Sequence, residues 1–256
     1  MDYLKMVSRL GIGSAHPGGF VATIEQLEKY KPAVNGTVLE IGCGTGRTAC
    51  YLAEQGYQVI ATDLDPHVLL KARKRAAAMG VHVDFVQADA HALPFQDNTF
   101  QTILVESVTN FTQAKTSVSE YFRVLKQDGV LYDREMFIRS SAPAERLVEL
   151  KTFFQMPALM KKEEWSSLLE DCGFSQIQLL EMNEVQDDKL KQQYECPDNY
   201  QYIDEGSLLD ASVLECGMQS SNMIMDHKEY LEYGTIRAVK NTEDHMDTQE
   251  NNNILG

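Results

Sequence analysis

From residue 37 onward, short apolar runs alternate with longer stretches in which apolar residues recur at helical spacing. The runs TVLEIG (37–42), QVIATD (58–63), VDFVQAD (83–89), QTILVES (101–107) and GVLYDREMF (129–137) are rich in β-branched and aliphatic residues. Such runs indicate buried strands. The stretches between them are long enough for helices, so that successive strands pair in parallel through right-handed crossovers. The pattern predicts an α/β fold with a doubly wound sheet.

Local signals mark where the intervening helices begin and end. Residues 46–55 have helical spacing, and Gly56 follows them as a terminator. Asp65 is suited to be an N-cap, with Pro66 at the first helical position, and Gly80 is placed to end that helix. We therefore expect helices on both faces of the sheet.

Beyond residue 140 the alternation loosens. Two helices are expected at 144–154 and 162–172, and two further strands at 175–182 (SQIQLLEM) and 233–240 (YGTIRAVK), which brings the sheet to seven strands. The segment between these strands, 183–232, carries helical stretches at 207–216 and 222–230. A connection of this length is typical of a lid or an interface element, and we interpret it as a substrate cap.

The two ends of the chain differ from this core. Residues 1–33 contain the turn GIGSAHPGGF followed by a helical stretch, and we expect them to fold over the ligand site of a main domain at 34–240. The tail 241–256 has few core-forming residues, which predicts disorder.

Composition narrows the function. The formal net charge of −15 disfavours nucleic acid as a partner, because polyphosphates need a basic footprint. No apolar run is long enough for a signal peptide or a membrane span, so no membrane partner is expected. The five cysteines are scattered without metal-ligand spacing, which fits reduced thiols in the cytoplasm and no metal site.

A glycine-rich turn follows the first strand. Glycines at 42, 44 and 46 let the backbone approach a ligand in the crevice beyond the carboxyl ends of the strands. Asp63 ends the second strand, where a carboxylate can accept hydrogen bonds from both ribose hydroxyls. These two features alone do not separate NAD from S-adenosylmethionine, nor a ligand turn from a structural one.

Four motifs, taken in their order along the chain, distinguish between these two ligands. LEIGCGTG (39–46) resembles motif I of class I S-adenosylmethionine-dependent methyltransferases, and VIATDLDP (59–66) their second-strand acidic motif. ADAHALPFQDNTFQTILVES (88–107) and RVLKQDGVLY (123–132) resemble the later motifs. Over roughly 34–137 the chain thus resembles the small-molecule family related to ubiquinone/menaquinone methyltransferases. The resemblance implies S-adenosyl-L-methionine as cofactor and an antiparallel last strand.

Two departures from the family pattern concern the fold more than the chemistry. Gln101 stands where the family usually has Asp, and Gln127-Asp128 replace the usual Pro-Gly.

The resemblance assigns roles around the methionine half of the cofactor. Gly42, Cys43, Gly44 and Gly46 would line it, and Glu40 would order the loop and the amino group.

Around the nucleoside half, the resemblance implies that Asp63 holds the ribose hydroxyls and that Leu64 packs against the adenine. Asp89 would accept from the adenine amino group, with the Ala90 backbone beside it.

Catalytic residues are harder to name, because methyl transfer is an in-line displacement that chiefly needs alignment and exclusion of water. Glu106 and Ser107 would lie near the sulfonium and the substrate. His16, in the turn His-Pro-Gly-Gly, is a second candidate, since histidine titrates near neutral pH. The alternative is that this turn only precedes a helix.

Three functions remain open at the level of sequence. The first is methyl transfer to a small-molecule acceptor by a protein that could form a homodimer. The second is an NAD-dependent oxidoreductase, and the third is a catalytically inactive protein that binds S-adenosylmethionine. Cys196 and Cys216 could also hold a metalloid. The alternative interpretation is that both are ordinary thiols.

Overall fold

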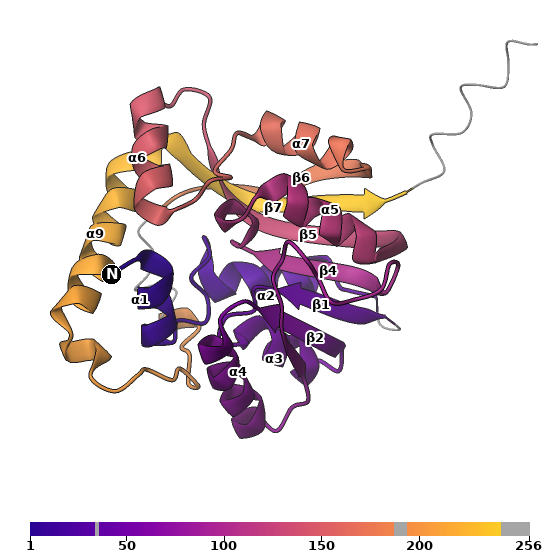
Figure 1. Cartoon of the computed structure of the whole chain (residues 1–256), viewed down its shortest axis with the longest axis horizontal. Coiled ribbons are helices and arrows are strands. Elements are labelled where there is room, and N and C mark those ends of the chain that lie inside the picture. The colour runs from indigo at the N-terminus through magenta and orange to yellow at the C-terminus, as the bar shows by residue number, and fades with distance from the viewer. Residues whose placement is uncertain (34–35, 187–193, 242–256) are drawn as a thin grey trace, which may run out of the picture.

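The computed structural model describes residues 1–33, 36–186 and 194–241 and contains a seven-stranded sheet (Figure 1). The strand order is β3-β2-β1-β4-β5-β7-β6, and β7 runs antiparallel to both its neighbours. The strands are β1 (Thr37–Ile41), β2 (Gln58–Asp63), β3 (Asp84–Gln87), β4 (Phe100–Glu106), β5 (Leu125–Ile138), β6 (Phe174–Glu184) and β7 (Leu231–Lys240). The expected doubly wound, mostly parallel sheet with an antiparallel last strand is confirmed.

Helices cover both faces of this sheet (Figure 1). They are α1 (Tyr3–Leu10), α2 (Gly19–Lys29), α3 (Arg47–Glu54), α4 (Pro66–Met79), α5 (Ala114–Val124), α6 (Ala144–Phe154), α7 (Lys162–Asp171) and α9 (Ala211–His227). Short 3-10 turns are η1 (Thr109–Phe111), η2 (Ser207–Leu209) and η3 (Lys228–Tyr230).

Alternate residues of each strand serve the two cores. Leu39 and Ile41 of β1 pack with α5 and α7, where Trp165 is fully buried. Val38 of the same strand packs with α2, α3 and α4, where Ala72 is buried. Because both faces are covered, the central strands read as nearly continuous apolar runs, which is why they stand out in the sequence.

Helix termini follow the local signals. The Asp65 carboxylate accepts from the His67 backbone N–H at 2.8 Å, Pro66 is the first residue of α4, and Gly80 ends that helix with φ = 69°. These contacts satisfy backbone groups that a helix end leaves open.

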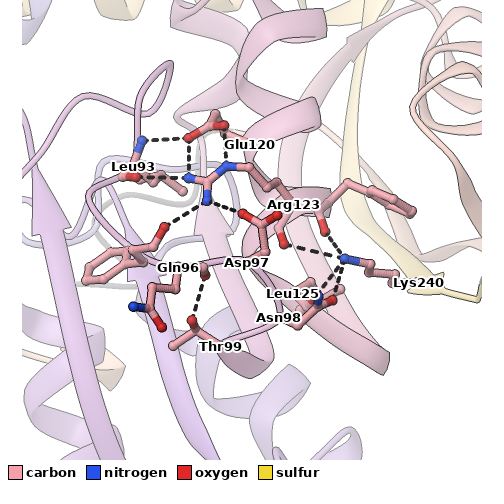
Figure 2. Close-up of polar contacts among 11 residues, drawn as sticks. Leu93, Gln96, Asp97, Asn98, Thr99, Glu120, Arg123, Leu125 and Lys240 are labelled. Carbon is pink, nitrogen blue, oxygen red and sulfur yellow. Dashed lines mark hydrogen bonds and ion pairs between the residues drawn. The ribbon is translucent and has the colours of Figure 1, made fainter.

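Figure 2 shows how the loop before β4 is fastened to the rest of the fold. The Arg123 guanidinium of α5 contacts the carboxylates of Glu120 and Asp97 and also donates to two loop carbonyls. The Lys240 ammonium, at the end of β7, donates to the Asn98 side chain at 2.9 Å and to backbone carbonyls at the end of α5 and the start of β5. The loop, α5 and the last strand are therefore held as one unit.

Several boundaries differ from expectation. The two helical stretches expected at 207–216 and 222–230 form one helix, α9, flanked by η2 and η3. The third strand ends at Gln87, so that Asp89 lies in the following turn. Asp128, at the Pro-Gly position of the family, has φ = 57°, a left-handed conformation that glycine adopts more readily. The tail expected to be disordered falls, from residue 242, outside the described residues.

Candidate active site

A cavity of about 1080 Å³ lies at the carboxyl ends of β1, β2 and β4. Its walls include these residues singled out by sequence: His16, Glu40, Gly42, Cys43, Gly44, Asp63, Leu64, Asp89, Ala90, Glu106 and Ser107. The first 20 residues and α9 contribute further walls. Residues of the first three motifs thus converge on one space, as expected for the crevice of an open α/β sheet, whereas none of the fourth motif (123–132) lines it.

The glycine loop after β1 has two distinct tasks. At Gly42, φ is 70° and an added Cβ would collide with Val108, so a side chain does not fit. Gly46 is not among the described residues that line the cavity. It is the N-cap of α3, and a Cβ there would lie 2.9 Å from that of Ala72. Gly46 therefore permits close packing of α3 on α4.

The Asp63 carboxylate is tied to the backbone around it. It accepts from the N–H of Gly44 at 2.8 Å and from the N–H of Asp65 at 2.9 Å. Burial raises the pKa of Asp63, although these donors oppose the shift. The carboxylate therefore fixes the relative position of the glycine loop and the β2–α4 turn, and Leu64 is exposed beside it.

Glu40 is the least compensated carboxyl group of the cavity wall. Its side chain is buried, and Oε2 has no hydrogen-bond partner in the described structure. Burial, and then the neighbouring Glu106 and Asp63, raise its pKa well above the usual value. A cationic group of a bound ligand would relieve this arrangement, and the ammonium of S-adenosylmethionine is such a group. The residues present fit the cofactor that the motifs imply.

On the opposite wall, Asp89 binds its neighbour His91. Asp89 Oδ1 lies 2.9 Å from the His91 backbone N–H and 2.7 Å from His91 Nδ1. His91 Nε2 in turn accepts from the backbone N–H of Gln113 at 2.9 Å, so the ring proton resides on Nδ1. The backbone and side-chain hydrogen bonds from His91 lower the pKa of Asp89, which remains half-exposed and ionised.

Glu106 forms the centre of a polar cluster where β4 ends. Hydroxyls of Thr23 and Thr48 donate to its two oxygens at 2.6 and 2.8 Å. His16 Nε2 lies 3.7 Å and Arg134 Nε 3.9 Å from Glu106 Oε1. Sequence reasoning brought forward Glu106 and His16 but missed the other three members. The signal for Arg134 was its place in a run of three charged residues, Asp133-Arg134-Glu135, inside a buried strand.

Charge is balanced within this cluster. Burial alone would raise the pKa of Glu106, but His16, Arg134 and the two hydroxyls together lower it, so that the carboxylate is ionised. Burial lowers the pKa of His16, with Glu106 opposing the shift, so that the imidazole is neutral at pH 7. The result is a neutral histidine beside a paired carboxylate.

A further part of the cavity wall is apolar and was not foreseen. It contains Tyr3, Phe111, Met136, Phe154, Met156, Val185 and Ile224. Within its described residues, the 183–232 segment contributes no tyrosine or methionine to the wall. From α9 the wall receives Gly217, Ser220 and Ile224 instead.

Residues 194–210 are bound to α3 and α4, next to the glycine loop, by charged side chains. Arg75 of α4 forms two bonds with Asp198, at 2.6 and 2.7 Å, and also donates to the Thr45 carbonyl. Arg47 donates to the Cys196 carbonyl at 2.7 Å. Lys71 contacts Asp204 at 2.8 Å. We call this stretch the strap.

Other sites considered from the sequence find no support in the described residues. No group of three His, Cys, Asp or Glu side chains there could hold a metal, and Cys216 packs in an apolar cluster with Met6 and Val213. No helix of the described part is long and apolar enough to cross a membrane.

Comparison with known proteins agrees with the motifs. The family model of the methyltransferase domain matches residues 38–129. The uncharacterized methyltransferase YodH of Bacillus subtilis is 36% identical over 180 residues, which cover 70% of this chain and 77% of that protein. A ubiquinone/menaquinone biosynthesis C-methyltransferase of Roseobacter denitrificans is 32% identical over 50% of this chain and 53% of its own length.

Solved structures share the fold at lower identity. Phosphoethanolamine N-methyltransferase 2 of Haemonchus contortus, in complex with phosphomonomethylethanolamine and S-adenosylhomocysteine, has a TM-score of 0.73 at 19% identity and covers 93% of this chain and 57% of its own. YcgJ of Bacillus subtilis has a TM-score of 0.65 at 20% identity, over 87% of this chain and 99% of its own. With the motifs, the cavity and the YodH relationship in agreement, the chain belongs to the class I S-adenosylmethionine-dependent methyltransferases.

Proposed function

We propose that this methyltransferase acts on a small-molecule acceptor, which it encloses together with the cofactor. The observation that carries the proposal is the single cavity that joins the motif residues to the apolar wall of α1, α6 and α9. Its volume of about 1080 Å³ lies just above the roughly 300–1,000 Å³ of single small-ligand sites, as a cavity for a cofactor and a small acceptor requires. Enclosure supplies what methyl transfer needs, namely alignment of the two reactants and exclusion of water.

The cofactor-binding roles follow from the positions of the motif residues. Glu40 would pair with the ammonium group, since its Oε2 has no protein partner in the described structure. Asp63 would accept from the ribose hydroxyls while keeping its backbone donors. Leu64 would cover the adenine, and Asp89 would accept from the adenine amino group. Gly42 to Gly44 would pass close to the methionine moiety.

The N-terminal segment and the strap would together form the cap over this site. α1 packs on α9 through Met6, Val213 and Cys216. The Gln201 side chain donates to the Leu10 carbonyl at 2.8 Å, which ties the strap to α1. The acceptor would therefore be selected by residues from both ends of the sequence.

Binding of the cofactor tests the assigned residues. Calorimetric titration with S-adenosylmethionine should show about 10- to 100-fold weaker binding for Asp63→Ala, because charged hydrogen bonds to the ribose are lost. Asp84→Ala, an exposed aspartate on β3, is the matched control and should bind normally. Equal affinity for the two variants would refute the role of Asp63.

The acceptor class is tested by following the methyl group. Protein and methyl-tritiated S-adenosylmethionine are incubated with a cell extract separated into low-mass and macromolecular fractions. We expect new labelled compounds in the low-mass fraction, separated from unreacted S-adenosylmethionine and absent when the protein is left out. Label confined to protein or nucleic acid would overturn the proposal of an enclosed small acceptor.

A further inference from the structure

His16 lines the cavity next to Glu106, at the end of β4. Only 5% of its side chain is exposed, and its Nε2 lies 3.7 Å from Glu106 Oε1. Glu106 and Ser107 border the place that the motifs assign to the reacting sulfur. The apolar residues Tyr3 and Phe111 line the same cavity. A base that takes a proton from the methyl-accepting molecule would have to lie near the reacting sulfur, as His16 does.

The hydrogen bonds around His16 define its tautomer. His16 Nδ1 lies 3.3 Å from the carbonyl of Pro17, which can only accept, and the tautomer that satisfies this carbonyl carries the ring proton on Nδ1. The Thr23 hydroxyl lies 3.3 Å from Nε2, but it donates its proton to Glu106 at 2.6 Å. The lone pair of Nε2 is therefore left to accept a proton from another molecule.

The charged surroundings suit a base that is neutral at rest and cationic after the proton transfer. Glu106 faces Nε2 and would stabilise the imidazolium, while Arg134 of β5 balances the Glu106 charge in the resting state. Arg47 of α3 and Arg134 oppose protonation, and Glu106 favours it. Thr23 could then accept from the protonated Nε2 while it continues to donate to Glu106.

The wall composition limits the acceptor. Among the described residues that line the cavity, the lysine and arginine side chains are Lys5, which is exposed, and Arg47, whose guanidinium binds the strap. An anionic acceptor such as a phosphate ester would therefore find no buried, unengaged cation among these residues. It would instead be repelled by several carboxylates of the wall. An ammonium group would lose its hydration shell beside the apolar side chains of Tyr3, Phe111 and Met136.

The geometry points to His16 as a general base that deprotonates the hydroxyl group of an uncharged, apolar acceptor, so that the enzyme is an O-methyltransferase. This inference rests on the proposed enclosure of a small acceptor. The O–H bond breaks as the proton passes to Nε2. The oxygen forms a bond to the methyl carbon, whose bond to sulfur breaks with its electron pair remaining on sulfur. The products are a methyl ether, S-adenosylhomocysteine and the imidazolium, which returns its proton to water.

Two phenols of similar size and different acidity test this role. At pH 8, 4-ethylphenol is almost wholly protonated and needs a base, whereas 4-nitrophenol is largely ionised and does not. For His16→Gln we expect kcat/KM to fall by about 100-fold or more with 4-ethylphenol and by less than about 5-fold with 4-nitrophenol. The control His82→Gln makes the same change at a histidine that is 90% exposed and should match the wild type with both phenols.

Other results would overturn the inference in distinguishable ways. An equal loss with both phenols, or no loss with either, would show that His16 is not the base. Calorimetry with S-adenosylmethionine confirms that the variant still folds and binds. Methylation of benzylamine without methylation of either phenol by the wild type would refute the hydroxyl acceptor. That outcome would not contradict the proposed function, an enclosed small-molecule acceptor. The proposed function is contradicted only if the label is confined to macromolecules.

Discussion

Two carboxyl groups are buried next to each other on β5. Asp133 and Glu135 are almost fully inaccessible, on the same side of the strand. The Thr109 hydroxyl donates to Asp133 at 2.7 Å, and the Asn110 N–H to Glu135 at 3.2 Å. The pair thereby holds η1, whose Phe111 forms part of the cavity wall. The protonation of these two buried carboxyl groups can therefore affect the position of η1 and of Phe111 in the cavity wall.

Titration of this pair should make the free energy of unfolding depend on pH. Burial raises the pKa of Asp133 to about 7, above its value in the unfolded chain. A raised carboxyl pKa contributes stability at low pH that is lost as the pH rises from about 4 through 7. Asp133→Asn keeps the shape of the side chain and removes the titrating carboxyl group at position 133. Relative to the wild type it should therefore gain stability with rising pH, by on the order of 2 kcal/mol between pH 5 and pH 8.

Urea unfolding at pH 5, 6, 7 and 8 measures this difference. Asp84→Asn, on the exposed start of β3, is the control and should follow the wild type throughout. If the curves of Asp133→Asn and the wild type stay parallel over this range, Asp133 does not titrate within it.

At the scale of elements, the ion pairs that hold the strap differ in burial, and Arg75–Asp198 is the most buried of those described. Arg75 is 2% exposed and Asp198 10%, whereas the pair Arg9–Asp210 farther along is 23% and 34% exposed. Removing one partner of a buried pair leaves an uncompensated charge, which costs about 3–5 kcal/mol, while exposed pairs contribute about 0–1 kcal/mol. Asp198→Asn should therefore release the strap, and Arg9→Gln should not.

Amide hydrogen exchange shows whether the release is local. In Asp198→Asn we expect faster exchange across residues 194–210 and weaker binding of S-adenosylmethionine, with β1 and β4 still protected. In Arg9→Gln, exchange in the strap should remain close to that of the wild type. Unchanged exchange of the strap in Asp198→Asn would show that other contacts hold it.

Elements with local signals were predictable from sequence, and those that depend on distant packing were not. The helix expected at 144–154 coincides with α6, because apolar spacing and turn residues bound it on both sides. The two stretches expected within 207–230 instead form α9, although Gly217, Ser220 and Ser221 suggest a break. Cys216 and Ser220 are buried on the inner side of α9, so tertiary contacts override weak local propensity there.

At the scale of the whole molecule, the cofactor half of the site was predictable because its motifs follow consecutive strands. The carboxyl ends of parallel strands must meet at one edge of the sheet, so Glu40, Asp63 and Glu106 converge by topology alone. The acceptor half is different. α1 lies against α9, about 200 residues away in sequence, as the Arg9–Asp210 pair shows, and no local pattern encodes that contact (Figure 1).

The acidic character of the entire chain leads to a last prediction, about ligand charge. The chain carries a formal net charge of −15, and Glu40, Asp63, Asp89 and Glu106 border the cavity. S-adenosylmethionine has one more positive charge than its product S-adenosylhomocysteine, because the sulfonium becomes a thioether. An acidic surface attracts the cationic ligand over a distance that shortens from about 14 Å at 50 mM salt to about 4 Å at 500 mM. Between these salt concentrations, calorimetry should show the affinity for S-adenosylmethionine falling several-fold more than that for S-adenosylhomocysteine. We expect most of this difference to lie in the association rate. Equal salt dependence for the two ligands would mean that selection of substrate over product rests on contacts at the sulfur alone.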